Sequence, residues 1–278
     1  MIVYFNGQFI PKEDVRISPD DRGFLFADGV YEVIASYSGR LFRPDAHFRR
    51  LERSLGELRI AVPDLQRQRE VMERLIEVND LRQGVAGIYI QITRGVAPRN
   101  HPFPPPGTPP TVYATAFPFE LPRKEQERGV KVILVPDIRW ARCDIKSVAL
   151  LANVLTCQQA MENDAEEAVL VRDGVLTEGT RNSVCAVFGG RLVTYPKTNY
   201  ILPGVTRDVV LELCGQLSIP FDEAPIYESR LKEADELMIV GTLSDIVPVV
   251  QVNDWQVGKG KPGPITRKLQ QAFRDLTR

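Results

Sequence analysis

Strand-like and helix-like segments follow one another in this chain without regular alternation. β-rich runs at 87–94 and 111–117 come after two helical patterns, and further β-rich runs at 131–135 and 168–178 precede the next clear helix. A doubly wound parallel sheet needs strands and helices that alternate one by one. The order of the patterns therefore predicts an α+β fold.

The N-terminal part carries clear local signals. Asn6-Gly7 between two short β-rich runs predicts a two-residue hairpin. Asp45 is expected to cap a helix whose apolar residues recur at spacings of three and four, and a second helix is expected over 65–78. The apolar stripe of the first helix consists of Phe48, Leu51, Leu55 and Leu58.

The C-terminal part is richer in strand signals. Gly189-Gly190 predicts another hairpin, and the apolar spacing over 206–217 predicts a helix. Strands near 237–240 and 246–252 and a helix from Pro264 close the chain.

Length and one linker-like stretch predict two domains. At 278 residues the chain has room for one large domain or two ordinary ones of about 150 residues. The stretch PFELPR at 118–123 is typical of a linker. We expect a small N-terminal domain of helices and strands at 1–118, an interdomain linker at 119–125 and a larger β-rich domain at 126–278.

The composition excludes several classes of function. The net charge of −1 lacks the basic excess of nucleic-acid-binding proteins, and four scattered cysteines with two histidines supply neither a disulfide framework nor a metal site. The longest apolar stretch, 148–155, is too short to cross a membrane, and the first residues lack a secretion signal. We therefore expect a cytoplasmic protein. Dinucleotide-binding, P-loop, zincin and G-x-S-x-G motifs do not occur.

Lys146 is the first candidate for chemistry. It precedes the apolar stretch and lies near Arg139 and Arg142, so desolvation and like charge would favour a neutral, nucleophilic amine. The position suits a lysine that forms a Schiff base. The alternative is a solvated lysine at the end of a strand.

Two further features are candidates for anion chemistry. Gly204 ahead of a helix start at Thr206 leaves free N–H groups for a phosphate monoester, or forms an ordinary turn with a threonine cap. Glu178 follows the Asp173-Gly174 turn and is either a buried anion or a solvated charge at a strand end.

Together these segments resemble a known family. In order along nearly the whole chain, they are similar to the class IV aminotransferases, the pyridoxal-phosphate enzymes of fold type IV, and most closely to those that act on D-amino acids. The resemblance implies the two-domain architecture of that fold type. The segments that carry it are DRGFLFADGVYEV, ITRGVAPRNHPFP, RWARCDIKS, TEGTRNS, LPGVTRDVV and GTLSDIVPV.

The resemblance implies roles for the cofactor-binding residues. Lys146 would form the Schiff base with pyridoxal 5'-phosphate and move the proton, and Glu178 would pair with the pyridine nitrogen. In the family the position before Thr242 often carries a serine whose hydroxyl binds the phosphate. At Gly241 we expect a backbone N–H in place of that hydroxyl. The implied phosphate cup consists of Arg50, the Val205 amide, Thr206, Gly241 and Thr242.

The resemblance also implies a substrate site. Tyr31, Arg99 and His101 would bind the α-carboxylate, and the loop of Arg99 would reach over from a neighbouring subunit, which implies a homodimer. This loop has six prolines between 102 and 110, and its alternative role is a ligand for a partner that binds polyproline. Arg181, where family members tend to have small residues, would either bind acidic substrate side chains or turn outward.

The function implied is transamination between a D-amino acid, such as D-alanine or D-glutamate, and a 2-oxo acid, with ping-pong kinetics. Three alternatives remain open: an aminodeoxychorismate lyase, a branched-chain L-amino-acid aminotransferase, and a dimer that binds small ligands without catalysis. Enzyme assays with a panel of D- and L-donors distinguish among them.

Overall fold

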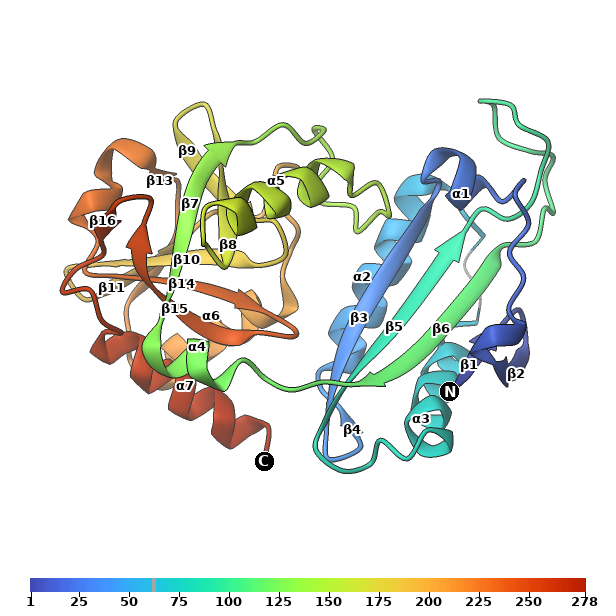
Figure 1. Ribbon diagram of the computed structural model, residues 1–278, viewed down its shortest axis with the longest axis horizontal. Helices are drawn as coiled ribbons and strands as arrows, with labels where there is room; N and C mark the ends of the chain where they lie inside the picture. The colour runs from blue at the N-terminus through green and yellow to red at the C-terminus, as the bar shows by residue number, and fades with distance from the viewer. Residues whose placement is uncertain (62–63) are drawn as a thin grey trace. The chain divides into compact units, whose positions relative to one another are not determined.

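The computed structural model describes residues 1–61 and 64–278 and divides into two compact units (Figure 1). Unit 1 consists of Met1–Glu120 and Ile145–Ala149, and unit 2 of Leu121–Asp144 and Leu150–Arg278. The expected domain at 126–278 therefore differs in one segment, because Ile145 lies in the core of unit 1 and Ser147 forms a bridge with Val30. The expected linker also contains the start of a helix, α4 (Arg123–Arg128).

Unit 1 is built on an antiparallel sheet, which has six strands in the described residues, in the order β2-β1-β6-β5-β3-β4. Asn6 and Gly7 both have positive φ angles, which confirms the predicted hairpin. The strands are β1 (Ile2–Phe5), β2 (Gln8–Pro11), β3 (Gly29–Tyr37), β4 (Arg40–Leu41), β5 (Val85–Thr93) and β6 (Thr111–Pro118).

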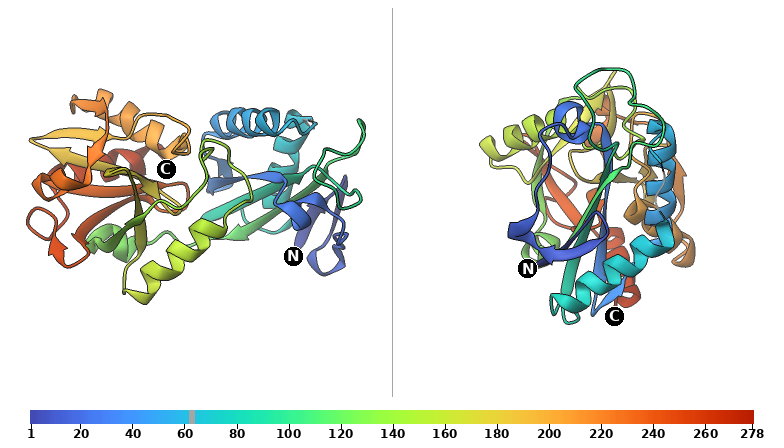
Figure 2. Two further views of the ribbon diagram at one scale, coloured as in Figure 1. Left: turned by 90° about the horizontal axis from the view of Figure 1, so that it is seen from above. Right: turned by 90° about the vertical axis from the view of Figure 1, so that its right-hand side faces the viewer.

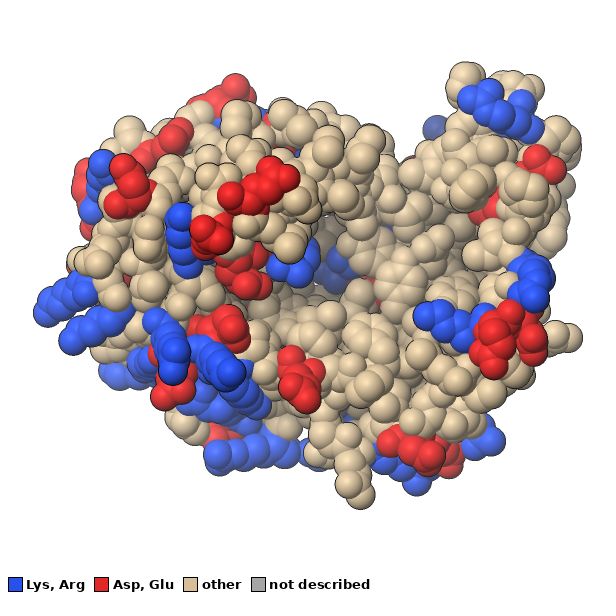
Figure 3. All heavy atoms as spheres, in the orientation of Figure 1, with Lys and Arg blue, Asp and Glu red and all other residues tan. Residues whose placement is uncertain are grey.

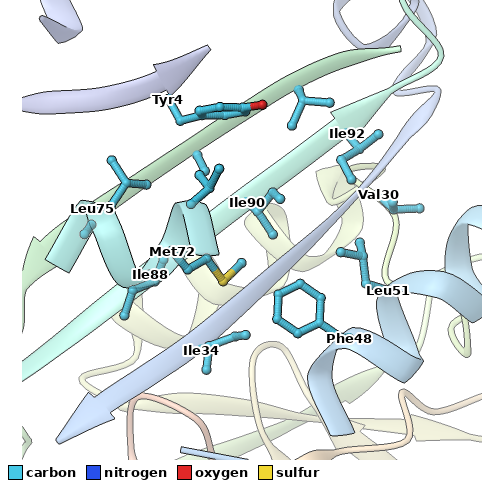
Figure 4. Close-up of a cluster of buried hydrophobic side chains, with 14 of the residues drawn as sticks. Tyr4, Val30, Ile34, Phe48, Leu51, Met72, Leu75, Ile88, Ile90 and Ile92 are labelled. Atoms are coloured by element: carbon cyan, nitrogen blue, oxygen red, sulfur yellow. The ribbon is translucent and has the colours of Figure 1, made fainter. Parts of the chain in front are cut away.

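Two amphipathic helices, α2 (Pro44–Leu58) and α3 (Leu65–Val78), cover one face of this sheet (Figure 2). Asp45 is not the N-cap of α2, because Pro44 needs no N–H partner and is itself the first residue of the helix, which makes Arg43 the N-cap. A 3-10 helix (Lys12–Asp14) and the short α1 (Arg22–Phe26) complete the unit. The core is shown in Figure 4 and includes Ile34, Phe48, Leu51, Met72, Leu75, Ile88 and Ile90.

Unit 2 is built on a mixed sheet, which has ten strands in the described residues. β7 pairs in parallel with both β8 and β15, whereas β8–β9 and β14–β15 are antiparallel. The strands are β7 (Val130–Pro136), β8 (Glu167–Arg172), β9 (Val175–Gly179), β10 (Ser183–Phe188), β11 (Arg191–Thr194), β12 (Phe221–Glu223), β13 (Ile226–Tyr227), β14 (Glu236–Gly241), β15 (Asp245–Val252) and β16 (Trp255–Gln256).

The helices of unit 2 are α4, α5 (Leu151–Glu162), α6 (Val205–Gln216) and α7 (Pro264–Leu276), with a 3-10 helix at Glu228–Glu233. The predicted helices near 206–217 and from Pro264 are confirmed. The apolar stretch at 148–155 runs into α5, which the sequence patterns did not predict.

The surface carries charges of both signs (Figure 3). Figure 3 shows side chains of both charges on the displayed face, Lys and Arg in blue and Asp and Glu in red. Among the described residues, every helix is too short or too polar to span a lipid bilayer.

Candidate active site

Lys146 is held in unit 1 by its own backbone. Its N–H donates to Ser54 Oγ at 3.2 Å, and its carbonyl accepts the N–H of Tyr31 at 3.0 Å. The Nζ atom lies 4.3 Å from the centroid of the Tyr31 ring. The residue is half-buried and lies outside the strands, so it is not a lysine at the end of a surface strand. The structure therefore brings together two of the expected site residues, Lys146 and Tyr31.

The arginines near Lys146 in sequence carry compensated charges. Arg139 pairs with Asp137 and Glu178, and Arg142 pairs with Asp144. Like-charge repulsion from these two arginines therefore does not support a neutral amine at Lys146, contrary to the expectation from the sequence.

Arg50 of α2 is fixed by a buried carboxylate on β3. Glu32 is 1% exposed and accepts two hydrogen bonds from Arg50, Nε to Oε1 at 2.7 Å and Nη2 to Oε2 at 2.9 Å. His47 Nδ1 lies 2.9 Å from the same Oε2. Burial alone would raise the pKa of Glu32, but the charge and hydrogen bonds of Arg50, with that of His47, hold this pKa far below its usual value.

His47 is a neutral donor in this group. Burial lowers the pKa of the imidazole and outweighs the opposite effect of Glu32. A neutral ring with its hydrogen on Nδ1 donates to Glu32, and Arg50 is the permanent cation bonded to that carboxylate. Glu32 and His47 thus orient the guanidinium.

Arg99 and His101 are both exposed and lie in the segment between β5 and β6. The guanidinium of Arg99 is 5.3 Å from the centroid of the Phe26 ring, and the ring of His101 is 5.5 Å from the same centroid. The R-x-H pair expected from the sequence therefore rests on one aromatic side chain.

In unit 2, Glu178 is a buried anion rather than a solvated strand end. Its side chain is 9% exposed, pairs with Arg139 and accepts the N–H of Leu202 at 3.1–3.2 Å. Burial would lower the pKa of Arg139, but its hydrogen bond with Asp137 and the charge of Glu178 raise it. The arginine is thus a permanent partner, and Glu178 is a fixed carboxylate at the end of β9.

The start of α6 is shaped for an anion. Gly204, its N-cap, has no side chain to occupy the first N–H groups of the helix, so those of Val205 and Thr206 face no capping oxygen of that residue. A Cβ at Gly204 would lie 2.6 Å from Ser183 Oγ, which is why the chain can approach β10 so closely here.

The turn between β14 and β15 adjoins the same segment. Gly241 packs against Asn182, the neighbour of Ser183, and Ser183 pairs in register with Val240. Thr206 and Thr242 therefore both belong to elements that meet at residues 182–183. Two hydroxyl groups and a helix start at one corner of unit 2 match the donors that a phosphate dianion needs.

Comparison with known proteins identifies the family. Residues 29–252 match the family of class IV amino-transferases. The chain belongs to the class IV aminotransferases. The D-alanine aminotransferase of Staphylococcus haemolyticus is 42% identical over 272 residues, 98% of this chain and 96% of that protein. The D-alanine aminotransferase of Bacillus licheniformis is 40% identical over 276 residues, 99% of this chain and 96% of that protein.

Solved structures of the family share the fold. A branched-chain amino acid aminotransferase of Escherichia coli has a TM-score of 0.91 at 27% identity and covers 99% of this chain and 94% of its own. That of Thermoproteus uzoniensis has a TM-score of 0.88 at 25% identity, with 100% and 94% covered. These findings confirm the predicted fold, the prediction of an aminotransferase and pyridoxal phosphate as the cofactor of this family.

Two departures from the family pattern have structural explanations in this aminotransferase. A Cβ at Gly241 would lie 2.3 Å from Asn182 Oδ1 and 2.9 Å from Ser244 Oγ, so Asn182 fills the space that a serine would need. Arg181 is 61% exposed and lies on Glu166, with Nη2 3.5 Å from Oε1. This favours the outward alternative, and Arg181 is left out of the substrate site proposed below.

The sequence patterns did not single out several residues that position this site. Glu167 is fully buried and accepts the backbone N–H of Thr180 at 3.0 Å and the Asn182 side chain at 2.7 Å, which fixes the turn after Glu178. Glu32 was also missed, although a lone acid within the β-rich run GVYEVIASY is a usable signal. Such an acid lies either on a solvated face of the sheet or in the interior with a charged partner. Arg50 on α2 is that partner here, so the acid is an interior one.

Proposed function

We propose that this chain is a pyridoxal-phosphate-dependent transaminase of D-amino acids, with a 2-oxo acid as acceptor and ping-pong kinetics. The observation that carries the proposal is Lys146, whose backbone is hydrogen-bonded on both sides while its amine lies over Tyr31. Identity of 40–42% to enzymes named D-alanine aminotransferase supports the choice of D-amino acids.

The residues present fit the cofactor. Bound pyridoxal phosphate supplies an aldehyde for amines and a ring that withdraws electrons from Cα. We assign Glu178 to the pyridine nitrogen, because a carboxylate that Arg139 keeps in place favours the protonated ring. Arg50, the amides at Val205 and Gly241, and the hydroxyls of Thr206 and Thr242 are assigned to the phosphate, which these donors neutralise without titrating.

Lys146 is assigned the covalent link to the cofactor and the transfer of the proton. Its Nζ would accept the Cα proton of the donor and pass it to the former aldehyde carbon of the cofactor, and two backbone hydrogen bonds hold the residue that carries this amine in place. Tyr31, Arg99 and His101 are assigned to the α-carboxylate of the substrate. A phenol, a guanidinium and an imidazole that bind one carboxylate would fix the side toward which the Cα hydrogen points, and so select the enantiomer.

We further propose a homodimer. The support on this chain is the row of exposed apolar side chains on α5, where Leu151, Val154, Leu155 and Met161 are 72%, 60%, 55% and 66% exposed. Such a row on one helix face is typical of a subunit interface.

The test is spectroscopic. A D-amino donor without acceptor should convert the visible absorbance of the cofactor-loaded protein to a shorter-wavelength band, and a 2-oxo acid should restore it. Lys146→Ala should abolish the conversion, and borohydride should fix the cofactor on the wild-type chain at Lys146. Lys259→Ala, at an exposed position, is the matched control and should behave as wild type. An unchanged spectrum with every D- and L-donor would refute the proposal.

A branched-chain L-amino-acid aminotransferase is the second candidate, because both solved structures described above carry that name. Conversion with L-leucine and none with D-alanine would decide for it.

A further inference from the structure

The short helix α1 contacts the loop that carries Arg99 and His101. Arg22, at its start, is 3% exposed. Its guanidinium donates to the carbonyl of Asn100 at 2.6 Å, and more weakly to those of His101 at 3.3 Å and Pro102 at 3.4 Å. One buried side chain therefore fixes three successive peptide groups, and His101 is the middle one.

Phe26, at the end of α1, is the second contact. Its ring centroid is 5.3 Å from the Arg99 guanidinium, 4.8 Å from that of Arg22 and 5.5 Å from the ring of His101. Cations are attracted to aromatic faces, and tilted aromatic pairs at this separation are favourable. Both side chains that we assign to the substrate carboxylate thus rest on one ring.

A buried ion cluster anchors this arrangement to the rest of unit 1. Asp28 accepts from Arg22 Nε at 2.8 Å and from Arg94 Nε and Nη2 at 2.7 and 2.9 Å. Arg94 also donates to the carbonyls of Leu58 and Arg59 at the end of α2. Its guanidinium lies 3.8 Å from the ring centroid of Phe103, so both ends of the 94–103 segment are tied to unit 1.

The side chains of this loop are mostly exposed. Arg99 and His101 are exposed although they contact Phe26, and the residues that follow are rich in proline and mostly exposed. Long exposed side chains lose rotamer freedom when they bind, and preorganisation removes part of that loss before the ligand arrives. Figure 1 shows α1 and this loop at the same end of the β3–β5–β6 sheet.

We propose that Phe26 and Arg22 are positioning residues for recognition of the amino acid carboxylate: Arg22 fixes the backbone around His101, and Phe26 holds the side chains of Arg99 and His101 in a binding-ready arrangement. This rests on the proposed function, because it takes Arg99 and His101 as carboxylate ligands. Neither positioning residue handles the Cα proton. Their loss should weaken carboxylate binding and leave the chemistry intact.

The test compares Phe26→Ala with Phe24→Ala. Phe24 lies on the same helix and is 76% exposed, so it is a matched control. Phe26→Ala should raise the KM for D-alanine and the inhibition constant of acetate, a bare carboxylate, each by about tenfold. Its kcat and its affinity for pyridoxal phosphate should stay within about twofold of wild type. Phe26→Tyr keeps the ring and should restore both constants.

A second measurement needs no turnover. Hydrogen exchange of the backbone amides in 95–103 should be faster in Arg22→Gln than in wild type or Phe24→Ala, because the three carbonyl contacts are lost. Unchanged exchange would overturn the role of Arg22. Equal KM and acetate inhibition in Phe26→Ala and Phe24→Ala, with an active wild type, would overturn the role of Phe26 and leave the proposed function standing. A wild type inactive with all donors would instead refute the proposed function, and with it the carboxylate role of Phe26.

Discussion

Glu32 shows how a single buried acid organises the site in unit 1. It is 1% exposed, and its two oxygens are bonded by Arg50 and approached by His47. A buried carboxylate persists in its charged form only if donors compensate its desolvation, and these two residues supply them. Its structural effect is to fix the plane of the Arg50 guanidinium.

Glu32→Gln should therefore weaken the binding of pyridoxal phosphate. The amide replaces one acceptor oxygen with a donor that faces Arg50 or His47, so the guanidinium loses its orientation and the phosphate loses a fixed partner. Hydrogen bonds to charged groups contribute about 1.5–3 kcal/mol, so the dissociation constant of the cofactor should increase roughly 10- to 100-fold. Cofactor titration followed by absorbance measures it. Glu52→Gln, at an exposed position of α2, is the control, and equal affinities in the two variants would contradict the prediction.

Gly241 and Asn182 should be energetically coupled. Gly241→Ser puts a Cβ 2.3 Å from Asn182 Oδ1, and overpacking of this kind destabilises by about 1–3 kcal/mol. Asn182→Ser alone loses the hydrogen bond to Glu167, but in the double variant it makes room for the serine. The double variant should be more stable than the sum of the single effects, by about 0.5–3 kcal/mol.

Urea unfolding of the four proteins in this cycle measures the coupling. Gly215→Ser is the control for a glycine-to-serine change, because a Cβ there meets nothing within 4 Å. Additive effects would show that Asn182 moves aside without strain.

The elements that the sequence predicted well are those with a strong pattern and a clear start. The bounds of α3 match the expected 65–78, because an amphipathic stripe follows Asp64, whose side chain accepts the N–H of Arg67. α1 has five residues, too few for a periodic pattern. α5 was missed because its sequence does not separate into an apolar face and a polar face. Its buried residues are Thr156 and Ala160, and most of its large apolar side chains are exposed.

The exposed apolar face of α5 should matter for assembly. Leu155→Glu places a charge on this face, and burial of an unpaired charge in an interface is strongly unfavourable. If α5 forms the subunit interface, sedimentation velocity should show at least a tenfold weaker dimer. Gln66→Glu adds the same charge at an exposed position of α3, in unit 1 rather than on α5, and should leave the dimer intact. A dimer of equal strength in both variants would exclude α5 from the interface.

For the molecule as a whole, the site roles came from motif resemblance rather than from spacing. Lys146, Glu178 and Thr206 each have an ordinary interpretation in local sequence, and only their joint order along the chain pointed to one cofactor. Contacts such as Phe26 with His101, or Asn182 with Gly241, join residues that are far apart in sequence. No local pattern contains these pairs, so the structure was needed to find them.

The stability of the molecule should fall as the pH falls below neutrality, and His47 should cause the first part of this loss. Burial lowers its pKa from the ordinary 6.5, so below that pH the unfolded chain binds a proton that the folded chain does not. The unfolding free energy therefore rises with pH in this range. Glu32 has a depressed pKa and contributes only in a lower window, as the pH falls through and below its ordinary 4.5.

His47→Gln keeps an N–H donor for Glu32 and removes the titration. Urea unfolding at pH 7 and pH 5.5 should show a smaller loss of stability in this variant than in wild type. The variant Phe24→Ala, at an exposed position, is the control and should show the wild-type loss of stability between the two pH values. Identical slopes in wild type and His47→Gln would contradict the prediction.

The segment Ile145–Ala149 is packed in unit 1, although the chain on both sides of it belongs to unit 2. On the ribosome, the N-terminal sheet is synthesised well before this segment emerges, so β3 must wait for Ser147 and Val148 to bond to Val30 and Gly29. The same five residues include Lys146, to which we assign the link to the cofactor. A translation product that stops at the linker thus lacks the last piece of its first core and, with it, the lysine proposed to bind the cofactor.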